Sequence, residues 1–169
     1  MTIWLTSDTH FNHANIIRYC GRPFAHLDEM NGTLIRNWNV CVQPNDTIYH
    51  LGDFALGPSA SVSSFFWQLN GKKILVRGNH DGRPTVRLPW DDQAEVFSLE
   101  GLTLVHNPAT IKVEGWVVHG HLHTRHKLTG PRQIHVGVDA WNYLPVALEE
   151  VLAICGSAAI PKGAEACGP

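Results

Sequence analysis

The chain has 169 residues, enough for one domain with a sizeable hydrophobic core. Hydrophobic residues make up 44% and charged residues 17%, which is ordinary for a globular protein. The net charge of −2 gives no support for a broad polyanion-binding surface. Histidine stands out, with 11 residues against 13 for lysine and arginine together.

No run of residues approaches the ~20 apolar positions that span a bilayer. The opening stretch MTIWLTSDTHF lacks the basic and apolar regions of a signal peptide. We therefore expect neither a membrane segment nor secretion. The four cysteines have no CxxC spacing and are expected to be reduced thiols of a cytoplasmic protein.

The first half of the chain alternates predicted strands and helices. Strands are expected at 2–7, 47–53 and 72–78, and helices at 26–42 and 59–70. Asp28 and Ser59 are the expected N-cap residues of the two helices.

The second half predicts mainly strands, at 94–107 (two strands around the Glu100-Gly101 turn), 111–120 and 132–139. A short closing helix is expected at 144–151, with Pro145 in its first turn. This order predicts an α/β fold in which two mixed β-sheets pack as a sandwich flanked by helices. We expect one domain at 1–152 and a flexible tail of small residues at 153–169.

Polar side chains able to bind metal follow five of the predicted strands, at the point where each strand ends. In an open α/β sheet, ligands bind outside the carboxyl ends of the strands, so these five ends are expected to converge on one site. Asp8 and His10 are two positions apart, as are His121 and His123, and an extended backbone would point each pair in one direction. Sharp turns and close backbone approach are expected at the glycines that precede polar residues: Gly52, Gly78 and Gly120.

Seven side chains are candidate metal ligands: Asp8, His10, Asp53, Asn79, His106, His121 and His123. One tetrahedral ion takes at most four protein ligands, so the excess predicts two ions about 3.5–4 Å apart that share one carboxylate. The donors include no thiolate, which indicates divalent ions such as Mn, the favoured one, or Fe, Zn, Co, Ni or Mg. Two dications balanced by two carboxylates would leave a positive pocket that favours phosphate.

Taken in order, these motifs resemble the calcineurin-like metallophosphoesterases: Asp8-Thr9-His10, Gly52-Asp53, Gly78-Asn79-His80-Asp81, His106 and Gly120-His121-Leu122-His123. The flanks SDTHFNHANIIRY and VGVDAWNYLPVALEE look like a small, stand-alone bacterial or phage branch of that family. The resemblance implies that Asp8, His10 and His123 hold one ion, that Asn79, His106 and His121 hold the other, and that Asp53 bridges both.

The resemblance also implies the chemistry, in which a hydroxide between the metals attacks phosphorus in line. Asp53 and His80 are the expected catalytic residues, with His80 as general acid or charge stabiliser. The family often has a second acid three residues after the bridging one, which orients this histidine. Leu56 occupies that position here, so no partner for His80 can be named.

Candidate substrate-binding residues are His13, Arg22, Arg77 and Arg83, because they flank the motifs and could contact phosphate oxygens. The other histidines are expected to be structural or solvated: His119 at a strand end, His126 in a loop, His50 in the core, and His26 and His135 as support.

The predicted function is hydrolysis of a phosphodiester or a small phosphomonoester. A phosphoprotein substrate is less favoured, because a small chain leaves few residues to build a groove for a protein partner. Two alternatives remain open, namely a catalytically silent metal-binding interaction scaffold of the same fold and a nuclease. The nuclease is not favoured by the charge distribution, since Lys and Arg form no stripe with interleaved aromatic residues. The sequence leaves the oligomeric state open.

Overall fold

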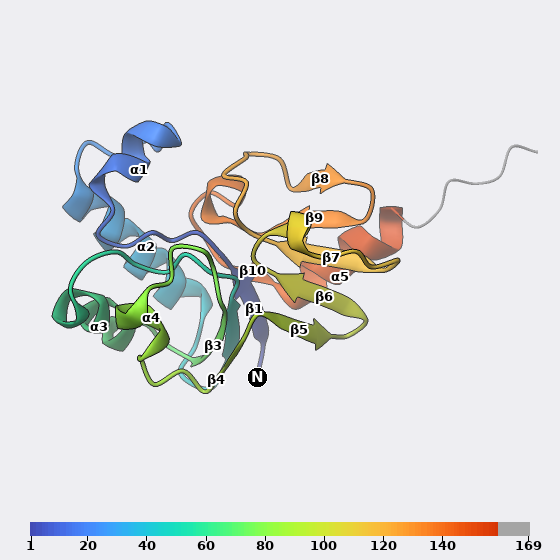
Figure 1. The fold of residues 1–169 in the computed structure, drawn as a ribbon, viewed down its shortest axis with the longest axis horizontal. Helices are drawn as coiled ribbons and strands as arrows, with labels where there is room; N and C mark the ends of the chain where they lie inside the picture. The colour runs from blue at the N-terminus through green and yellow to red at the C-terminus, as the bar shows by residue number, and fades with distance from the viewer. Residues whose placement is uncertain (159–169) are drawn as a thin grey trace, which may run out of the picture.

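The computed structural model describes residues 1–158 and shows two five-stranded β-sheets packed face to face, with helices beside them (Figure 1). The helices are α1 (Ala14–Tyr19), α2 (Leu27–Cys41), α3 (Ser59–Gln68), α4 (Arg83–Val86) and α5 (Leu148–Ala158), with short 3-10 turns η1 (Pro108–Thr110) and η2 (Val138–Ala140). This is the predicted α/β architecture of two mixed sheets flanked by helices.

The first sheet has the order β10-β1-β2-β3-β4. Its strands are β1 (Ile3–Thr6), β2 (Thr47–His50), β3 (Lys72–Val76), β4 (Asp92–Ala94) and β10 (Val146–Ala147). The pairs β1–β2, β2–β3 and β3–β4 are parallel, and β10 is antiparallel to β1. The parallel arrangement brings the carboxyl ends of β1, β2 and β3 to one edge.

The second sheet has the order β5-β6-β7-β9-β8. Its strands are β5 (Val96–Leu99), β6 (Leu102–Val105), β7 (Trp116–His119), β8 (Leu128–Gly130) and β9 (Gln133–His135). The inner pairs β6–β7 and β7–β9 are parallel, whereas β5 and β8 pair antiparallel at the edges. The two predicted strands around Glu100-Gly101 are confirmed as β5 and β6.

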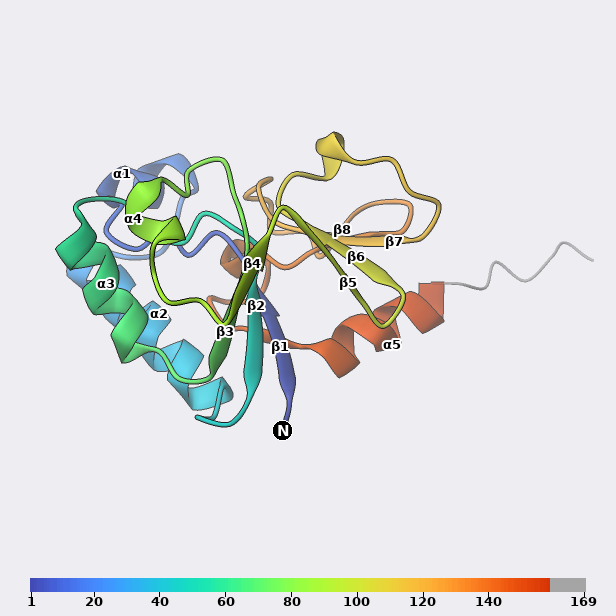
Figure 2. The ribbon, with the colours of Figure 1, turned by 60° about the horizontal axis from the view of Figure 1, so that its bottom comes forward.

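Each face of the first sheet is covered by a different layer (Figure 2). Helices α1 to α4 lie on one side, where Met30, Leu34 and Trp38 of α2 join a core that includes Ile48 and Leu75. On the other side, the second sheet closes a separate core. That core contains Leu5, Leu51, Val76, Leu104, Val118 and Ile134. Full burial of each such large side chain contributes about 1.5–3 kcal/mol, so both faces of the first sheet are anchored.

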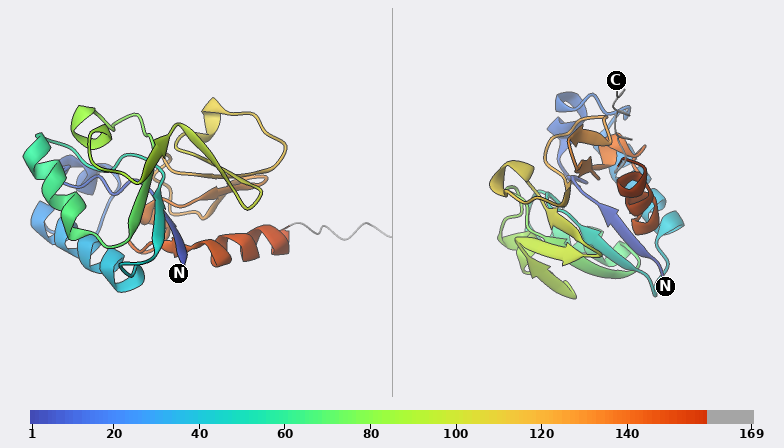
Figure 3. Two further views of the ribbon diagram at one scale, coloured as in Figure 1. Left: turned by 90° about the horizontal axis from the view of Figure 1, so that it is seen from below. Right: turned by 90° about the vertical axis from the view of Figure 1, so that its right-hand side faces the viewer.

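Helix α5 differs from the predicted closing helix. Pro145 precedes β10, and the helix begins only at Leu148 and continues to Ala158, beside the N-terminal strand (Figure 3). Residues 153 to 158 of the expected tail therefore belong to this helix, with Cys155 buried against the core. The rest of that tail, 159 to 169, lies outside the described residues. None of the helices in residues 1–158 is both long and apolar enough to cross a membrane.

The predicted N-caps are wrong by one or two residues. His26 caps α2 and its side chain accepts the Glu29 N–H, while Asp28 lies in the first turn. Pro58 precedes α3, which makes Ser59 the first helical residue. Helix α1 was not predicted, because its six residues are too few to show a helical period.

His50 is a core residue, as predicted. Its ring is fully buried, stacks on Trp38 at 6.2 Å between centroids, and lies 2.9 Å through Nε2 from the Thr9 hydroxyl. Burial lowers the pKa of His50 from 6.5 to about 3. The folded protein therefore excludes a proton that the unfolded chain binds below pH 6.5.

Stability should fall as the pH falls through this window, and His50→Leu should remove that part of the dependence. From pH 7 to pH 5 the free energy of unfolding of the parent should fall by up to about 2 kcal/mol more than that of the variant. The Thr9 hydroxyl keeps its bond to the Phe54 carbonyl, so no buried donor is left unpaired. Urea unfolding of both metal-free proteins at the two pH values measures the difference, and equal pH dependence would refute it.

Candidate metal centre

The predicted convergence of strand ends is observed, and backbone hydrogen bonds beyond the strands produce it. The N–H groups of Asp8 and His10 donate to the carbonyls of Gly52 and Asp53, both at 3.0 Å. In the second sheet the Gly120 N–H donates to the His106 carbonyl at 3.0 Å. The loops that carry the motifs are therefore extensions of the two sheets and are held in register.

Five of the seven candidate ligands have a left-handed backbone, which non-glycine residues rarely adopt. Their φ angles are +58° at Asp8, +48° at His10, +60° at Asp53, +71° at His121 and +48° at His123. The expectation of an extended backbone at the two i, i+2 pairs is therefore wrong. The chain kinks at each of these five ligands, and these kinks set the direction of each side chain separately.

Close approach of backbone to ligand explains the glycines of the motifs. A Cβ at Gly120 would overlap the Ser7 hydroxyl and lie 2.6 Å from Asp8 Oδ2. A Cβ at Gly78 would collide with the carboxylate and the backbone nitrogen of Asp53. Any side chain at either position would therefore displace a candidate ligand.

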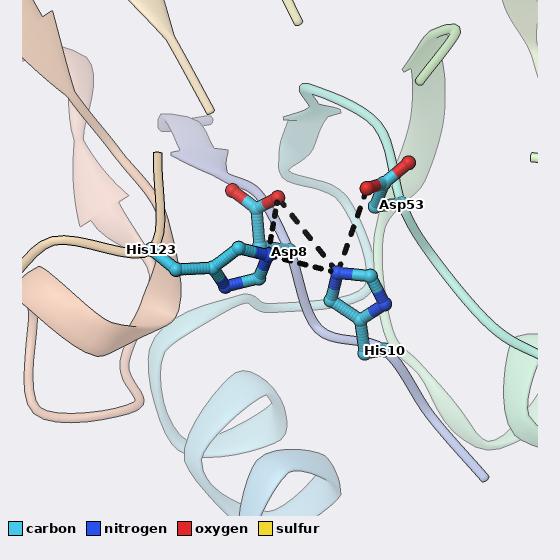
Figure 4. A group of neighbouring side chains, drawn as sticks. All are labelled: Asp8, His10, Asp53 and His123. Atoms are coloured by element: carbon cyan, nitrogen blue, oxygen red, sulfur yellow. Dashed lines mark hydrogen bonds and ion pairs between the residues drawn. The ribbon is translucent and has the colours of Figure 1, made fainter. Parts of the chain in front are cut away.

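The first donor group consists of Asp8, His10, Asp53 and His123, whose ligand atoms all lie within 4.8 Å of one another (Figure 4). His10 Nε2 is 3.2 Å from His123 Nε2, 3.5 Å from Asp53 Oδ2 and 4.0 Å from Asp8 Oδ1. His123 Nε2 is 3.8 Å from Asp8 Oδ1. All except His123 are buried.

The second donor group consists of Asp53, His106 and His121, with Asn79 beside them. His106 Nε2 is 3.4 Å from Asp53 Oδ2, 3.0 Å from Asn79 Oδ1 and 3.2 Å from His121 Nδ1. His106 Nδ1 is 2.7 Å from the Leu51 carbonyl, an arrangement in which Nδ1 carries the proton and Nε2 faces the group.

Asp53 belongs to both groups through one oxygen. Its Oδ2 lies 3.5 Å from His10 Nε2 and 3.4 Å from His106 Nε2, while Oδ1 accepts the His80 N–H at 2.8 Å. Two donors bound to one ion at about 2.0–2.2 Å must lie roughly 3–4 Å apart, and most of the separations in both groups meet this condition. The oxygen and nitrogen donors therefore fit divalent ions, and a shared carboxylate oxygen fits two of them.

The charges of the first group depend on burial and on the neighbouring rings. Burial lowers the pKa of His10 to about 3, which leaves its ring neutral and able to bind a cation. Burial alone would also lower the pKa of His123, but the Asp139 carboxylate raises it to about 10. Burial raises the pKa of Asp8, but the surrounding histidines lower it by more, so the pKa lies below its ordinary value and the carboxylate is ionised.

His80 and Asp81 have different positions in the motif loop. His80 is exposed, and its ring lies 5.7 Å from that of His10 between centroids. Asp81 points inward and accepts the N–H groups of Asp53, Phe54 and Gly78 at 2.8–2.9 Å. The sequence singled out Asp81 as part of a motif but gave it no role, since nothing local reveals which backbone groups it meets.

The candidate substrate residues separate into two sets. Arg77 and His13 lie near the centre. Arg77 is half-exposed, pairs with Glu95 at 3.3 Å and lines a cavity beside the second group. The His13 ring lies 5.4 Å from the His10 ring between centroids. Arg83 is exposed on α4 and does not line that cavity. Arg22 was wrongly expected to contact substrate, because its buried guanidinium bonds Asp139 and backbone carbonyls on the side of the centre that faces the protein interior, the closed side.

Asp139 is the residue that sequence reasoning missed. It follows β9 in η2, and its Oδ2 lies 3.2 Å from His123 Nδ1. Its sequence signals were its place at the end of the predicted strand 132–139 and in the flank VGVDAWNYLPVALEE. The predicted non-ligand histidines agree with the structure, since His119 bonds Thr129 and the Gly120 carbonyl, and His126 is exposed.

The fold and the gathered carboxylates and histidines define an α/β protein with a candidate metal centre. A model of the calcineurin-like phosphoesterase family matches residues 1–150, and the chain belongs to this family. An uncharacterized protein of Methanocaldococcus jannaschii is 40% identical over 163 residues, covering 89% of each chain. The Gene 66 protein of Mycobacterium phage D29 is 33% identical, covering 88% of this chain and 93% of the relative.

Among solved structures, a protein of unknown function from Aquifex aeolicus superimposes with a TM-score of 0.71 at 23% identity. The match covers 90% of this chain and 98% of that one, and it shows that the two share a fold. Family membership identifies a phosphoesterase by class and agrees with the candidate metal ligands.

Replacing Asp81 with Asn should loosen the loops that carry Asp53 and Asn79. An amide can accept through only one oxygen, so at least one of the three N–H donors would face its NH2 group. Hydrogen bonds to a charged acceptor are worth about 1.5–3 kcal/mol, so we expect a loss of about 2–3 kcal/mol of stability. Urea unfolding of the metal-free proteins measures this loss, and an unchanged midpoint would contradict it.

Proposed function

We propose that the protein hydrolyses phosphodiesters, or small phosphomonoesters, with two divalent ions, manganese foremost, held by the seven candidate ligands. The observation that carries the proposal is the shared oxygen of Asp53, which lies within 3.5 Å of a ring nitrogen in each donor group. When bound, such ions would polarise the phosphoryl oxygens and lower the pKa of a water molecule. Asp8, His10 and His123 would hold one ion, and Asn79, His106 and His121 the other.

The exposed side of the centre supports a role for His80 at the substrate. Its backbone is fixed by the bond to Asp53, whereas its ring is exposed toward solvent next to His10. A ring in this position can donate a proton to the leaving oxygen or stabilise charge on the phosphoryl group. Leu56 occupies the position of the second acid and is 45% exposed, so that position offers His80 no carboxylate partner.

A cavity beside the second donor group supports a small substrate. It has a volume of ≈ 580 Å³, within the range of small-molecule sites, and is lined by Arg77, Asn79, Val96, Val105, His106 and His121 among others. Arg77 would contact phosphate oxygens at its rim, and the two valines would contact the organic part of the ester. A substrate of this size agrees better with a small diester than with a phosphoprotein.

Metal-stripped protein should not hydrolyse bis-p-nitrophenyl phosphate, and added Mn²⁺ should restore hydrolysis. Asp53→Asn removes the charge shared by both groups and should lower kcat/KM by about 100-fold or more. His126→Gln, a substitution of an exposed loop histidine, should retain parental activity.

The result would distinguish the alternatives. Folded protein that binds Mn²⁺ but hydrolyses neither this diester nor p-nitrophenyl phosphate would favour the interaction scaffold. Activity confined to single-stranded or double-stranded nucleic acid would favour the nuclease.

His80→Asn should lower kcat by about 10²–10⁴-fold while Mn²⁺ affinity stays unchanged, because no hydrogen bond or ion pair among the described residues joins the His80 ring to a candidate ligand. If His80 is a general acid, the loss should be larger for an alkyl ester than for a p-nitrophenyl ester, whose leaving group needs no proton. Equal losses on both esters would instead support charge stabilisation. A large change in Mn²⁺ affinity would contradict either role.

A further inference from the structure

We propose that Arg22 and Asp139 are positioning residues that hold one half of the metal centre, the group Asp8, His10 and His123, in its binding geometry. This inference rests on the metal-dependent function proposed above. Neither residue contacts the open side of the site, and neither belongs to the seven candidate ligands.

Between the two neutral tautomers of the His123 ring, the position of Asp139 favours the one with the proton on Nδ1, whose Nε2 can bind a cation. His123 Nε2 faces Asp8 and His10, so Nε2 must be free of its proton when it binds an ion, and Nδ1 must carry the proton. Asp139 Oδ2 lies 3.2 Å from Nδ1 and can accept this proton in a hydrogen bond. A carboxylate behind a ligand histidine fixes both the tautomer and the ring orientation.

Arg22 holds Asp139 in place from the closed side. Its Nε and one terminal nitrogen donate to the two carboxylate oxygens at 2.9 and 3.0 Å, a paired arrangement that fixes the plane of the carboxylate. The two side chains are almost fully enclosed, at 0% and 3% exposure. A buried pair of this kind is costly to break from one side, since the remaining charge would be unpaired.

The same guanidinium holds the backbone of the first motif. Its terminal nitrogens donate to the carbonyls of Asp8 at 2.7 Å and Thr9 at 3.1 Å. These carbonyls lie between Asp8 and His10, whose left-handed backbone directs both ligands into the first group. One side chain therefore positions the Asp8–His10 turn directly and His123 through Asp139.

The side chains of the second donor group have their own support, although the His121 N–H also donates to the Asp8 carboxylate. The Leu51 carbonyl orients His106, and the His80 N–H and the loop held by Asp81 position Asp53. No described contact joins Arg22 or Asp139 to Asn79, His106 or His121. Loss of the pair should therefore weaken one ion and spare the other.

Asp139→Asn tests this asymmetry with little change of shape. Asp139 accepts Arg22 N–H donors on both oxygens, so either orientation of the amide turns its NH2 toward one of them. Calorimetric titration of metal-stripped protein with Mn²⁺ should show two ions in the parent. In the variant, one affinity should fall by about 10–100-fold, with little change in the other. Arg22→Lys, which cannot form the paired contact, should act in the same direction.

Asp46→Asn is the matched control. Asp46 is also a buried carboxylate that accepts three donors, from Thr2, Trp4 and Gln43, but it lies at the opposite end of β1. This control should lower the urea midpoint and leave both Mn²⁺ affinities unchanged. Excess Mn²⁺ should restore the turnover of Asp139→Asn but not that of His80→Asn.

Two failures can be told apart. A parent protein that binds no Mn²⁺ would refute the proposed function itself. A parent that binds two ions, with both affinities lowered equally or neither lowered in folded Asp139→Asn and Arg22→Lys, would overturn the positioning role. If Asp139→Asn does not fold, Arg22→Lys decides the question in the same titration.

Discussion

The burial of two carboxylates, Asp8 and Asp53, is the constraint on which the rest of the site depends. They are 0% and 2% exposed at the junction of the two sheets, and a buried carboxylate without a partner costs several kcal/mol. Both oxygens of Asp8 lie 3.0–3.1 Å from the His121 N–H, and Asp53 accepts the His80 N–H at 2.8 Å. Five loops from two sheets close around these charges. The histidines on these loops either donate hydrogen bonds to the carboxylates or offer ring nitrogens that can bind cations.

Backbone strain is the second consequence of this arrangement. Left-handed non-glycine residues cost about 1–3 kcal/mol each, and five candidate ligands have this conformation. They are maintained because hydrogen bonds between neighbouring loops continue the sheets past the strand ends, as at Asp8–Gly52 and His10–Asp53. These hydrogen bonds offset the strain, so the donor atoms are already near one another in the folded protein.

The centre has a closed side and an open side with different chemistry. Arg22, Asp139 and Asp81 are directed inward, where charged groups meet carboxylates, ring nitrogens and backbone groups. The open side presents His80 and the cavity that Arg77 lines. The walls of that cavity combine the apolar side chains of Val96 and Val105 with the charged and amide groups of Arg77 and Asn79. This division separates the groups that position ligands from those that can contact an ester.

The sequence by itself determined the alternation of elements, the sandwich of mixed sheets and the family, because these depend on periodicity and on motifs whose order is preserved along the chain. It also identified the seven candidate ligands, since each follows an apolar strand. Only the tertiary structure decided that the ligand backbone is kinked, that Arg22 lies on the closed side, and that Asp139 lies behind His123 across 16 residues. Such contacts depend on how loops from different strands pack against one another, and the local sequence around each residue does not specify that packing.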